Sequence, residues 1–294
     1  MFQSMFRVNL RVPLSLTAIL ALAVLSGGMT AARQSASEVR PPKVTSLRLY
    51  VLNCGQIMGM DPKTWGYNPG EIAHPDAAVV CHLIVHPKGT LIWDTGVVPD
   101  EEIGTSAPGS NRAGPPLRGQ LAALGYRPED ISYLALSHYH VDHAANSNMF
   151  KASTWLVRQA ERDTMFGEKP PPVGVPKNYA ELKNSKTIIL DKDEYDVFGD
   201  GQVVIKAAPG HTPGHQVLIL RLKKTGPVML GGDLYHFPEQ RNSDHVPTFE
   251  YDKAQTLKSR AAIEDYVKRN RMQFWIEHDW VANSKLKKAP QYYE

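Results

Sequence analysis

Three histidines and one aspartate occupy six consecutive residues, His138 to His143, directly after the apolar run 131–136. Alternate residues of an extended chain project to the same side, so His138 and His140 can bind one ion. Asp142 and His143 follow where the chain is expected to turn, and they are aimed at a neighbouring position. Imidazole and carboxylate ligands suit zinc or another first-row ion, and the absence of cysteine from the run argues against a structural zinc knuckle. We therefore predict a metal site here rather than a histidine-rich surface loop.

The first 32 residues have the pattern of an export signal. Arg7 and Arg11 lead into an apolar run over 12–25, which is shorter than the about 20 residues of a comfortable membrane span. Small residues over 27–32 suit a signal peptidase, with cleavage after Ala32. We expect a signal peptide over 1–32, a flexible leader over 33–45 and a folded domain over 46–294. The protein is then periplasmic or secreted and free of the membrane after signal cleavage; an uncleaved anchor is the alternative.

The net charge limits the classes of partner that can be expected, and the two cysteines allow a disulfide. The formal charge of +3 falls to about +1 once Arg7 and Arg11 are removed, and no basic cluster remains. Nucleic acid and membrane surfaces are therefore not expected partners, and a small-molecule substrate is. Cys54 and Cys81 can pair in an oxidising compartment, but two buried free thiols fit the sequence equally well.

Apolar periodicity predicts strands and helices that alternate along the chain. A hairpin is expected from the strands 77–85 and 90–94, and the strongest helical pattern covers 251–270. Residues 104–116 are predicted to be a surface loop. The remaining predictions are strands over 47–52, 131–136, 154–157, 187–190, 202–207, 217–220, 228–230 and 273–276, and helices over 117–124, 144–150 and 159–166. Helices between the strand sets of both halves predict sheets covered by helices.

The loop after the first strand carries an unusual number of large apolar side chains, namely Met58, Met60, Trp65 and Tyr67. Glycine and proline break any regular element in this loop. We predict that these four residues bind substrate, as a lid or pocket wall for an apolar part of it. The alternative is a loop that packs onto the core.

Further ligand-type residues follow later apolar strands, and they are His211, Asp233 and His278. Loops at strand ends are where a rigid scaffold presents functional groups. Asp94 ends the strand 90–94 and is expected to orient a ligand histidine through a hydrogen bond, and His215 is expected to fix a loop. The other histidines lack partner spacing and are expected to be structural or solvated: His74, His82, His86 and His245.

These motifs resemble those of the metallo-β-lactamase superfamily over about residues 46–280. The resemblance rests on Asp94-Thr95-Gly96, the His138–His143 run, Gly210-His211-Thr212-Pro213-Gly214, Gly232-Asp233 and His278. It implies an α/β fold, a four-layer αβ/βα sandwich with two divalent metal ions, most simply Zn²⁺, between the sheets. It also implies that residues 46–294 form a hydrolase domain.

The same resemblance implies a division of the ligands between two ions. His138, His140 and His211 would bind one ion. Asp142, His143 and His278 would bind the other, with Asp233 as the bridge. Two cations about 3.5–4 Å apart can share a hydroxide that attacks an ester, lactone, thioester or amide carbonyl. Asp142 is then a candidate catalytic proton donor to the leaving group.

Within the superfamily, the flanking sequence most resembles the quorum-quenching N-acyl-homoserine lactonases. The apolar loop, Ser137 and the segment 276–279 carry this likeness. It implies an exported enzyme that opens a lactone ring, and a homodimer is common in that group. Those lactonases usually carry a substrate-binding tyrosine three residues after the bridging aspartate, where this chain has His236. Tyr235 lies one residue earlier, so both Tyr235 and His236 are catalytic candidates for contact with the oxyanion.

Other functions share most of these residues. A β-lactamase would suit the compartment, but lactamases with an all-histidine first site generally lack the bridging aspartate. A thioester hydrolase of the glyoxalase II type uses the same ligands. A metal-bound binding protein without turnover is the alternative from a different class.

Overall fold

Two β-sheets form the centre of the molecule, and both faces of most strands are apolar. The computed structural model describes residues 41–105 and 109–294, and the strand counts below refer to these residues. The first sheet has seven strands in the order β4-β1-β2-β3-β5-β6-β7: β1 (Arg48–Ile57), β2 (Ala77–His86), β3 (Gly89–Trp93), β4 (Asn111–Arg112), β5 (Tyr133–Ala135), β6 (Thr154–Val157) and β7 (Thr187–Ile189). The second has five in the order β12-β11-β10-β9-β8: β8 (Glu194–Asp196), β9 (Val203–Ala207), β10 (Gln216–Leu222), β11 (Gly226–Leu230) and β12 (Gln273–Trp275).

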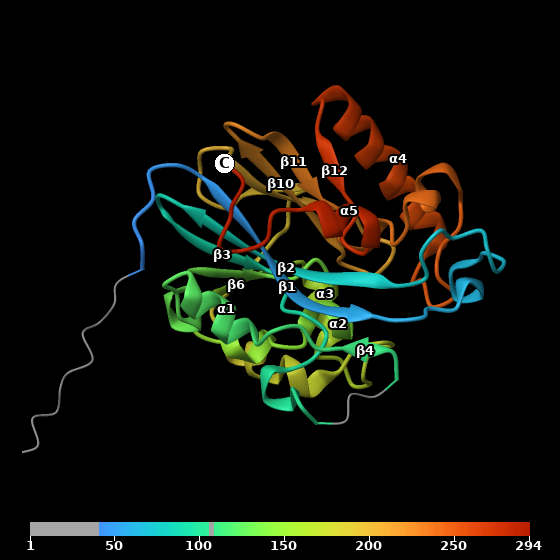
Figure 1. Ribbon diagram of the computed structural model, residues 1–294, viewed down its shortest axis with the longest axis horizontal. Coiled ribbons are helices and arrows are strands. Elements are labelled where there is room, and N and C mark those ends of the chain that lie inside the picture. Colours follow the sequence, from blue (N-terminus) through green and yellow to red (C-terminus); the bar gives the residue numbers. More distant parts are fainter. Residues whose placement is uncertain (1–40, 106–108) are drawn as a thin grey trace, which may run out of the picture. The chain divides into compact units, whose positions relative to one another are not determined.

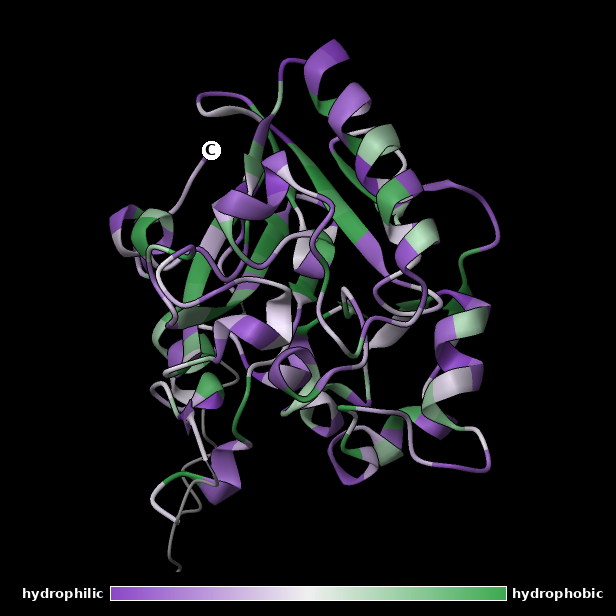
Figure 2. Ribbon diagram, turned by 90° about the vertical axis from the view of Figure 1, so that its right-hand side faces the viewer, coloured by the Kyte–Doolittle hydropathy of each residue, from purple (hydrophilic) through white to green (hydrophobic). Residues whose placement is uncertain are grey.

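Helices cover the outer face of each sheet. In Figure 1, α4 runs beside the second sheet, and the shorter α1 and α3 lie on the side of the first. The described α-helices are α1 (Leu117–Ala123), α2 (Val141–Ala144), α3 (Gln159–Met165), α4 (Lys253–Arg269) and α5 (Trp280–Lys285). Figure 2 shows green, hydrophobic strands beneath helices that are mixed or purple. The order of layers is the predicted four-layer αβ/βα sandwich.

Alternation along each strand explains this layering. In β10, Leu218 and Leu220 belong to a core shared with Trp93 of the first sheet, so they fill the space between the sheets. Ile219 belongs instead to the cluster that contains Ile263 of α4. A strand with apolar residues on both faces can bury both only between two other layers. The core around the sheets is therefore divided into one inner and two outer clusters, and a fourth, smaller cluster contains Trp65, Tyr67, Ile72 and Phe237.

Several predicted elements differ from the observed ones. The helix expected over 144–150 is instead the short α2 and a separate 3-10 turn, Ser147–Phe150. Asn146 interrupts it, because its side-chain amide donates to the carbonyl oxygens of Thr95 and Val98, at 2.9 and 3.2 Å. β4, which pairs with the end of β1, lies within the expected surface loop 104–116. The pattern also missed β8 and α5.

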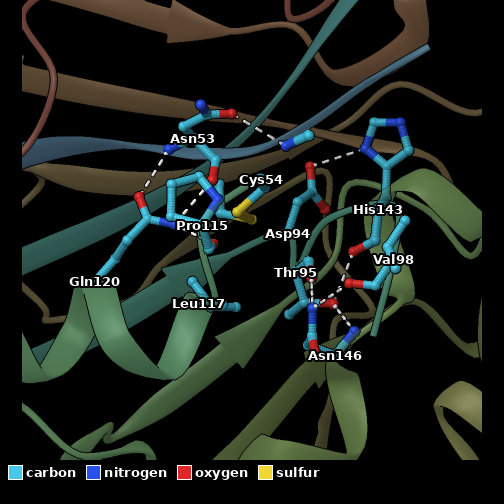
Figure 3. The surroundings of a disulfide bond; sticks show 12 residues. Asn53, Cys54, Asp94, Thr95, Val98, Pro115, Leu117, Gln120, His143 and Asn146 are labelled. Carbon is cyan, nitrogen blue, oxygen red and sulfur yellow. Dashed lines mark hydrogen bonds and ion pairs between the residues drawn. A yellow bond between two sulfur atoms is a disulfide. The ribbon is translucent and has the colours of Figure 1, made fainter. Parts of the chain in front are cut away.

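A disulfide joins Cys54 of β1 to Cys81 of β2, with the two Cα atoms 5.7 Å apart. The register of the two strands shifts between Asn53 and Gly55, so Cys54 lies in a β-bulge. The structure thus contains the paired cysteines, one of the two alternatives that the sequence left open. The loop that begins at Asp94 lies beside this disulfide (Figure 3).

The structure describes only the last residues of the N-terminal segment for which a signal peptide and a leader were predicted. The expected signal peptide over 1–32 and the leader up to residue 40 lie outside the described residues. The last residues of the expected leader contact the domain: the Tyr126 hydroxyl donates to the carbonyl oxygen of Pro42 at 3.3 Å, and Val44 packs against the core. Over residues 41–105 and 109–294, no helix has the length and apolar character needed to cross a membrane.

Candidate metal centre

The candidate ligands lie in segments that follow the ends of four strands, and Asp142 and His143 lie in α2. β5 leads to His138, β9 to His211, β11 to Asp233 and β12 to His278. Gly232 adopts φ +49° beside Asp233, and a Cβ at this position would lie 2.8 Å from both Ser137 Cβ and His215 Nε2. Only glycine allows the loop to approach so closely, and this approach brings Asp233 between the other ligands.

The first cluster contains three imidazoles and one carboxylate: His138, His140, His211 and Asp233. His140 Nδ1 lies 3.0 Å from His211 Nε2, and Asp233 Oδ2 lies 3.5 and 3.4 Å from His138 Nε2 and His211 Nε2. One ligand atom from each residue lies within 4.8 Å of the others, and all four residues are buried. We call this group cluster 1.

The second cluster contains two imidazoles and two carboxylates: Asp142, His143, Asp233 and His278. Asp233 Oδ1 lies 3.1 Å from His143 Nε2 and 3.0 Å from His278 Nε2. Asp142 Oδ2 lies 3.4 and 3.3 Å from the same two nitrogens. We call this group cluster 2. The two oxygens of Asp233 therefore face different clusters.

Unpartnered buried atoms show that these residues fit metal ions. His138 Nε2, His143 Nε2 and Asp233 Oδ1 are buried and make no hydrogen bond, although the last two lie 3.1 Å apart as an ion pair. A buried polar atom without a partner costs about 1–3 kcal/mol, and native proteins rarely leave one. All three atoms point into the clusters, where a cation would satisfy them. Imidazole and carboxylate are the ligands of zinc and related ions.

The ligand histidines differ in charge, and hydrogen bonds to Asp233 and Glu250 outweigh burial and raise the pKa of His211 to about 9. Burial holds the pKa of His138 and of His140 well below the usual value, so both imidazoles are neutral, as metal ligands must be. Burial acts in the same direction on His143, but the carboxylates of Asp233 and Asp142 outweigh it and hold its pKa well above the usual value. The negative charge buried in cluster 2 requires positive charge nearby, which a divalent cation supplies.

Asp94 orients His143, as predicted (Figure 3). Asp94 Oδ2 lies 3.1 Å from His143 Nδ1, and Asp94 Oδ1 accepts a hydrogen bond from the Ser137 backbone N–H at 2.6 Å. Asp94 is fully buried and has φ +59°, a conformation that aspartate tolerates better than most residues. A hydrogen bond at Nδ1 fixes the ring so that Nε2 faces the cluster.

His138, His211 and His278 also have partners at the nitrogen that faces away from the clusters. His211 Nδ1 lies 2.9 Å from Glu250 Oε2, and His278 Nδ1 donates to the carbonyl oxygen of Ala78 at 2.8 Å. Ser137 Oγ lies 3.1 Å from Nδ1 of both His138 and His143. These contacts fix tautomer and orientation, which is the usual arrangement around metal-binding histidines.

His215 fixes a loop, as predicted. Its Nε2 accepts the backbone N–H of Asp233 at 3.0 Å, so Nδ1 carries the proton and donates to the carbonyl oxygen of Ala208 at 3.0 Å. Burial lowers the pKa of His215 to about 3, consistent with a neutral ring. His215 therefore positions the backbone of Asp233 and is not among the grouped ligand atoms.

Residues 74–270 match the family model of the metallo-beta-lactamase superfamily. The chain belongs to this superfamily. It is 30% identical to the N-acyl homoserine lactonase AttM of Azorhizobium caulinodans, over 85% of this chain and all of that protein. It is 27% identical to an N-acyl homoserine lactonase of a Bacillus species, with the same coverage.

Solved structures of this superfamily share the fold. The match to an N-acyl homoserine lactone hydrolase with N-hexanoyl-L-homoserine at its catalytic metal centre has a TM-score of 0.70 and 24% identity, and covers 86% of this chain and all of that one. The match to AidC, a dizinc quorum-quenching lactonase, has a TM-score of 0.65 and 19% identity over 87% and 96% of the chains. The predictions of fold and of a lactonase-like metal-dependent hydrolase are confirmed.

The structure brings His236, and not Tyr235, to this metallo-beta-lactamase centre. His236 Nε2 lies 3.1 Å from Asp233 Oδ2, and its ring lies 4.1 Å from that of Trp65 between centroids. Tyr235 points the other way, because consecutive extended residues face opposite sides. Its ring packs against Phe274 and under the guanidinium of Arg260. The expectation that Tyr235 contacts the reacting groups is therefore wrong.

An apolar cavity of about 250 Å³ opens onto the clusters. Met60 and Trp65, two of the four predicted substrate-binding residues, line it. Met58 and Tyr67 do not line the cavity. The Tyr67 ring packs edge-on against His245, and its hydroxyl forms a hydrogen bond with Ser243. The full lining is Ile57, Met60, Asp61, Thr64, Trp65, Asn111, His140, Val141, Asp142, Val173, Asp233, His236, Phe249 and His278.

Buried carboxylates around the centre were missed by sequence reasoning. Glu250 contacts His211, and Glu277 Oε1 lies 3.5 Å from His143 Nδ1. Glu161 contacts the loops on either side of cluster 1. Their sequence neighbourhoods carry no ligand spacing, and Glu277 stood out only as the neighbour of His278.

Proposed function

We propose that this protein hydrolyses N-acyl-homoserine lactones by opening the lactone ring. The observation that carries the proposal is the position of Asp233, whose two oxygens face two separate ligand clusters at the floor of an apolar cavity. The likeness to N-acyl homoserine lactonases over 85% of the chain supports the choice of substrate. The predicted seven ligands are proposed to hold two divalent ions, most simply zinc: His138, His140, Asp142, His143, His211, Asp233 and His278.

The reaction adds water across the ester bond of the ring. The water oxygen bonds to the carbonyl carbon, the bond to the ring oxygen breaks, and that oxygen takes a proton to give the open hydroxy acid. Two bound divalent ions would supply Lewis acidity and lower the pKa of water towards neutrality. Asp142 lines the cavity and is proposed to carry the proton to the ring oxygen.

Two other features of the cavity suit this substrate. His236 lines it beside Asp233 and is proposed to contact the carbonyl oxygen of the lactone, the role that the resemblance gives to a tyrosine. Met60, Trp65 and Phe249 form an apolar wall for the acyl chain. Each buried CH₂ of that chain contributes about 0.8 kcal/mol to binding.

Hydrolysis of a small panel by the metal-loaded mature chain tests the proposal. The panel contains a long-chain N-acyl-homoserine lactone, a simple γ-lactone, a chromogenic cephalosporin, a lactoyl thioester and an aryl ester. Rapid turnover of the acylated lactone, lost in Asp142→Ala, is the expected result. Preferred turnover of the cephalosporin or the thioester would replace the lactonase proposal by one of those activities. No turnover with two metals bound would favour a binding protein.

We also propose that the protein is exported. The charged and apolar pattern of residues 1–32 and the Cys54–Cys81 disulfide support this, because disulfides persist in oxidising compartments. Fractionation of cells that express the full chain should recover a protein shortened by about 32 residues outside the cytoplasm. Recovery of the full-length chain in the cytoplasm would exclude export.

A further inference from the structure

Glu161 is a buried acidic residue of α3 that contacts two loops of the metal centre. Only 3% of the surface of Glu161 is exposed to solvent. Oε1 accepts the backbone N–H of Tyr139 at 2.8 Å, and Oε2 accepts the backbone N–H of Gly214 at 2.8 Å. The Thr212 hydroxyl lies within reach of both oxygens, at 3.0 and 2.8 Å.

These contacts lie next to every histidine of cluster 1. Tyr139 separates His138 from His140, and Thr212 directly follows His211. One carboxyl group thus joins the loop after β5, in the first sheet, to the loop after β9, in the second. The hydrogen bonds described for Glu161 include none to cluster 2.

We propose that Glu161 is a positioning residue that sets the separation of the three cluster 1 histidines and thereby the affinity of cluster 1 for its metal ion. It acts through the backbone of Tyr139 and Gly214 and the hydroxyl of Thr212, without touching the ion. This inference rests on the ligand assignment of the proposed function, but not on the identity of the substrate.

The contacts require a group with two acceptor oxygens. The N–H groups of Tyr139 and Gly214 can only donate, and each meets a different oxygen of Glu161. Glutamine has one acceptor oxygen and one NH₂ group. In either orientation of its amide, the NH₂ group would face one of the two backbone N–H groups. Glu161→Gln therefore preserves the shape of the side chain but breaks at least one of the contacts.

Gly214 shows how closely α3 presses on the loop of His211. A Cβ at Gly214 would lie 2.6 Å from Glu161 Cβ and 2.7 Å from Glu161 N. No real Cβ fits at such distances from backbone, so glycine is required for the helix to reach the loop. Loop and helix are therefore in direct contact, and a displaced Glu161 would displace the loop with it.

The test compares metal affinities in two backgrounds that each keep one cluster. His278→Ala retains cluster 1, and His140→Ala retains cluster 2. Zinc affinity is measured by competition with a chromophoric chelator, and the absorption spectrum of the Co²⁺ form reports the ligand geometry. Adding Glu161→Gln to the His278→Ala background should weaken zinc binding roughly 10–100-fold, as the loss of a ligand-orienting contact does, and should change the Co²⁺ spectrum. In the His140→Ala background the affinity should stay within about twofold.

Matched variants separate positioning from general stability. Glu168→Gln, the same change at an exposed residue just after α3, should leave both affinities unchanged. Thr212→Val removes one contact and should produce a smaller loss at cluster 1, which keeps the test valid if Glu161→Gln does not fold. Equal losses at both clusters, or a lower unfolding temperature of the metal-free protein with unchanged affinities, would overturn the inference. Lactone turnover by the unaltered protein is measured separately, so failure of the substrate assignment would be recognised independently.

Discussion

Clusters 1 and 2 share Asp233 but differ in how they are built. Cluster 1 adds three imidazoles to the shared carboxylate, whereas cluster 2 adds two imidazoles and the carboxylate of Asp142. The carboxyl groups of Asp94 and Glu277 lie behind the His143 ring of cluster 2, and burial raises the pKa of Glu277 well above its usual value. The carboxyl group of Glu250 lies in the same way behind the His211 ring of cluster 1. Cluster 2 therefore offers two carboxylates as ligands and cluster 1 offers one, and Asp233 and Glu250 raise the pKa of His211 in cluster 1 to about 9. The two clusters are thus made chemically unequal by the residues around them.

The difference suggests how each site selects its ion. Sites rich in imidazole suit zinc and the first-row ions next to it in the periodic table. Added carboxylate ligands also allow harder ions such as manganese to bind. We expect cluster 1 to retain zinc selectively and cluster 2 to accept several divalent ions. The following variants test this contrast.

Asp233→Asn should have the largest effect, because it weakens both clusters at once. We expect at most one ion per chain by elemental analysis and a fall in kcat/KM of roughly 10²–10³-fold or more, comparable to the loss of a positioned electrostatic group. Asp244→Asn, the same change at an exposed residue, is the control. Two tightly held ions in Asp233→Asn would contradict the shared role of this carboxylate.

Asp94→Asn and Glu250→Gln should affect opposite clusters. Asp94 orients His143 and Glu250 orients His211. Each substitution should therefore lower the metal affinity of one cluster by roughly 10–100-fold and leave the affinity of the other cluster unchanged. Chelator competition in the single-cluster backgrounds measures both affinities. If both variants weakened the same ion, the division into two clusters would be wrong.

His236→Phe should separate substrate contact from metal binding. Phenylalanine keeps a ring against Trp65 but removes the nitrogen that lies beside Asp233. We expect unchanged metal content and a roughly tenfold lower kcat, the value of one lost hydrogen bond to the reacting group. A loss of metal would instead identify His236 as an additional ligand.

Trp65→Ala should have the smallest effect, confined to the acyl chain. Loss of apolar contact area should raise KM for a long-chain lactone roughly three- to tenfold, with less effect on a short-chain one. Tyr67→Phe, in the same loop but outside the cavity lining, should change neither. Equal increases for both chain lengths would place the acyl chain elsewhere.

The sequence predicted those parts of the site that follow local rules. His138 and His140 could be paired because residues two apart in extended backbone share a face. His211, Asp233 and His278 could be found because each follows an apolar strand. Asp94 was found for the same reason. The four-layer fold followed from the resemblance and from helices between sets of strands.

Contacts between segments distant in sequence could not be predicted. Glu161 and Gly214 are 53 residues apart in the sequence, and Glu250 and His211 are 39 apart. No motif or regular spacing in the sequence predicts either contact. The choice between Tyr235 and His236 depends on which face of one short segment turns to the cavity, which a single-residue shift reverses. The helix expected over 144–150 failed because Asn146 prefers hydrogen bonds to the loop that follows Asp94.

A single carboxylate that faces both clusters also makes them thermodynamically dependent on each other. An ion held by one oxygen of Asp233 restricts the rotation of the carboxylate, so the second ion meets a ligand that is already oriented. Occupancy of one cluster should therefore change the affinity of the other, and by linkage each ion must affect the other to the same extent. The affinity measured for one cluster alone, as in the single-cluster variants, would then differ from the affinity of the same cluster in the fully loaded protein.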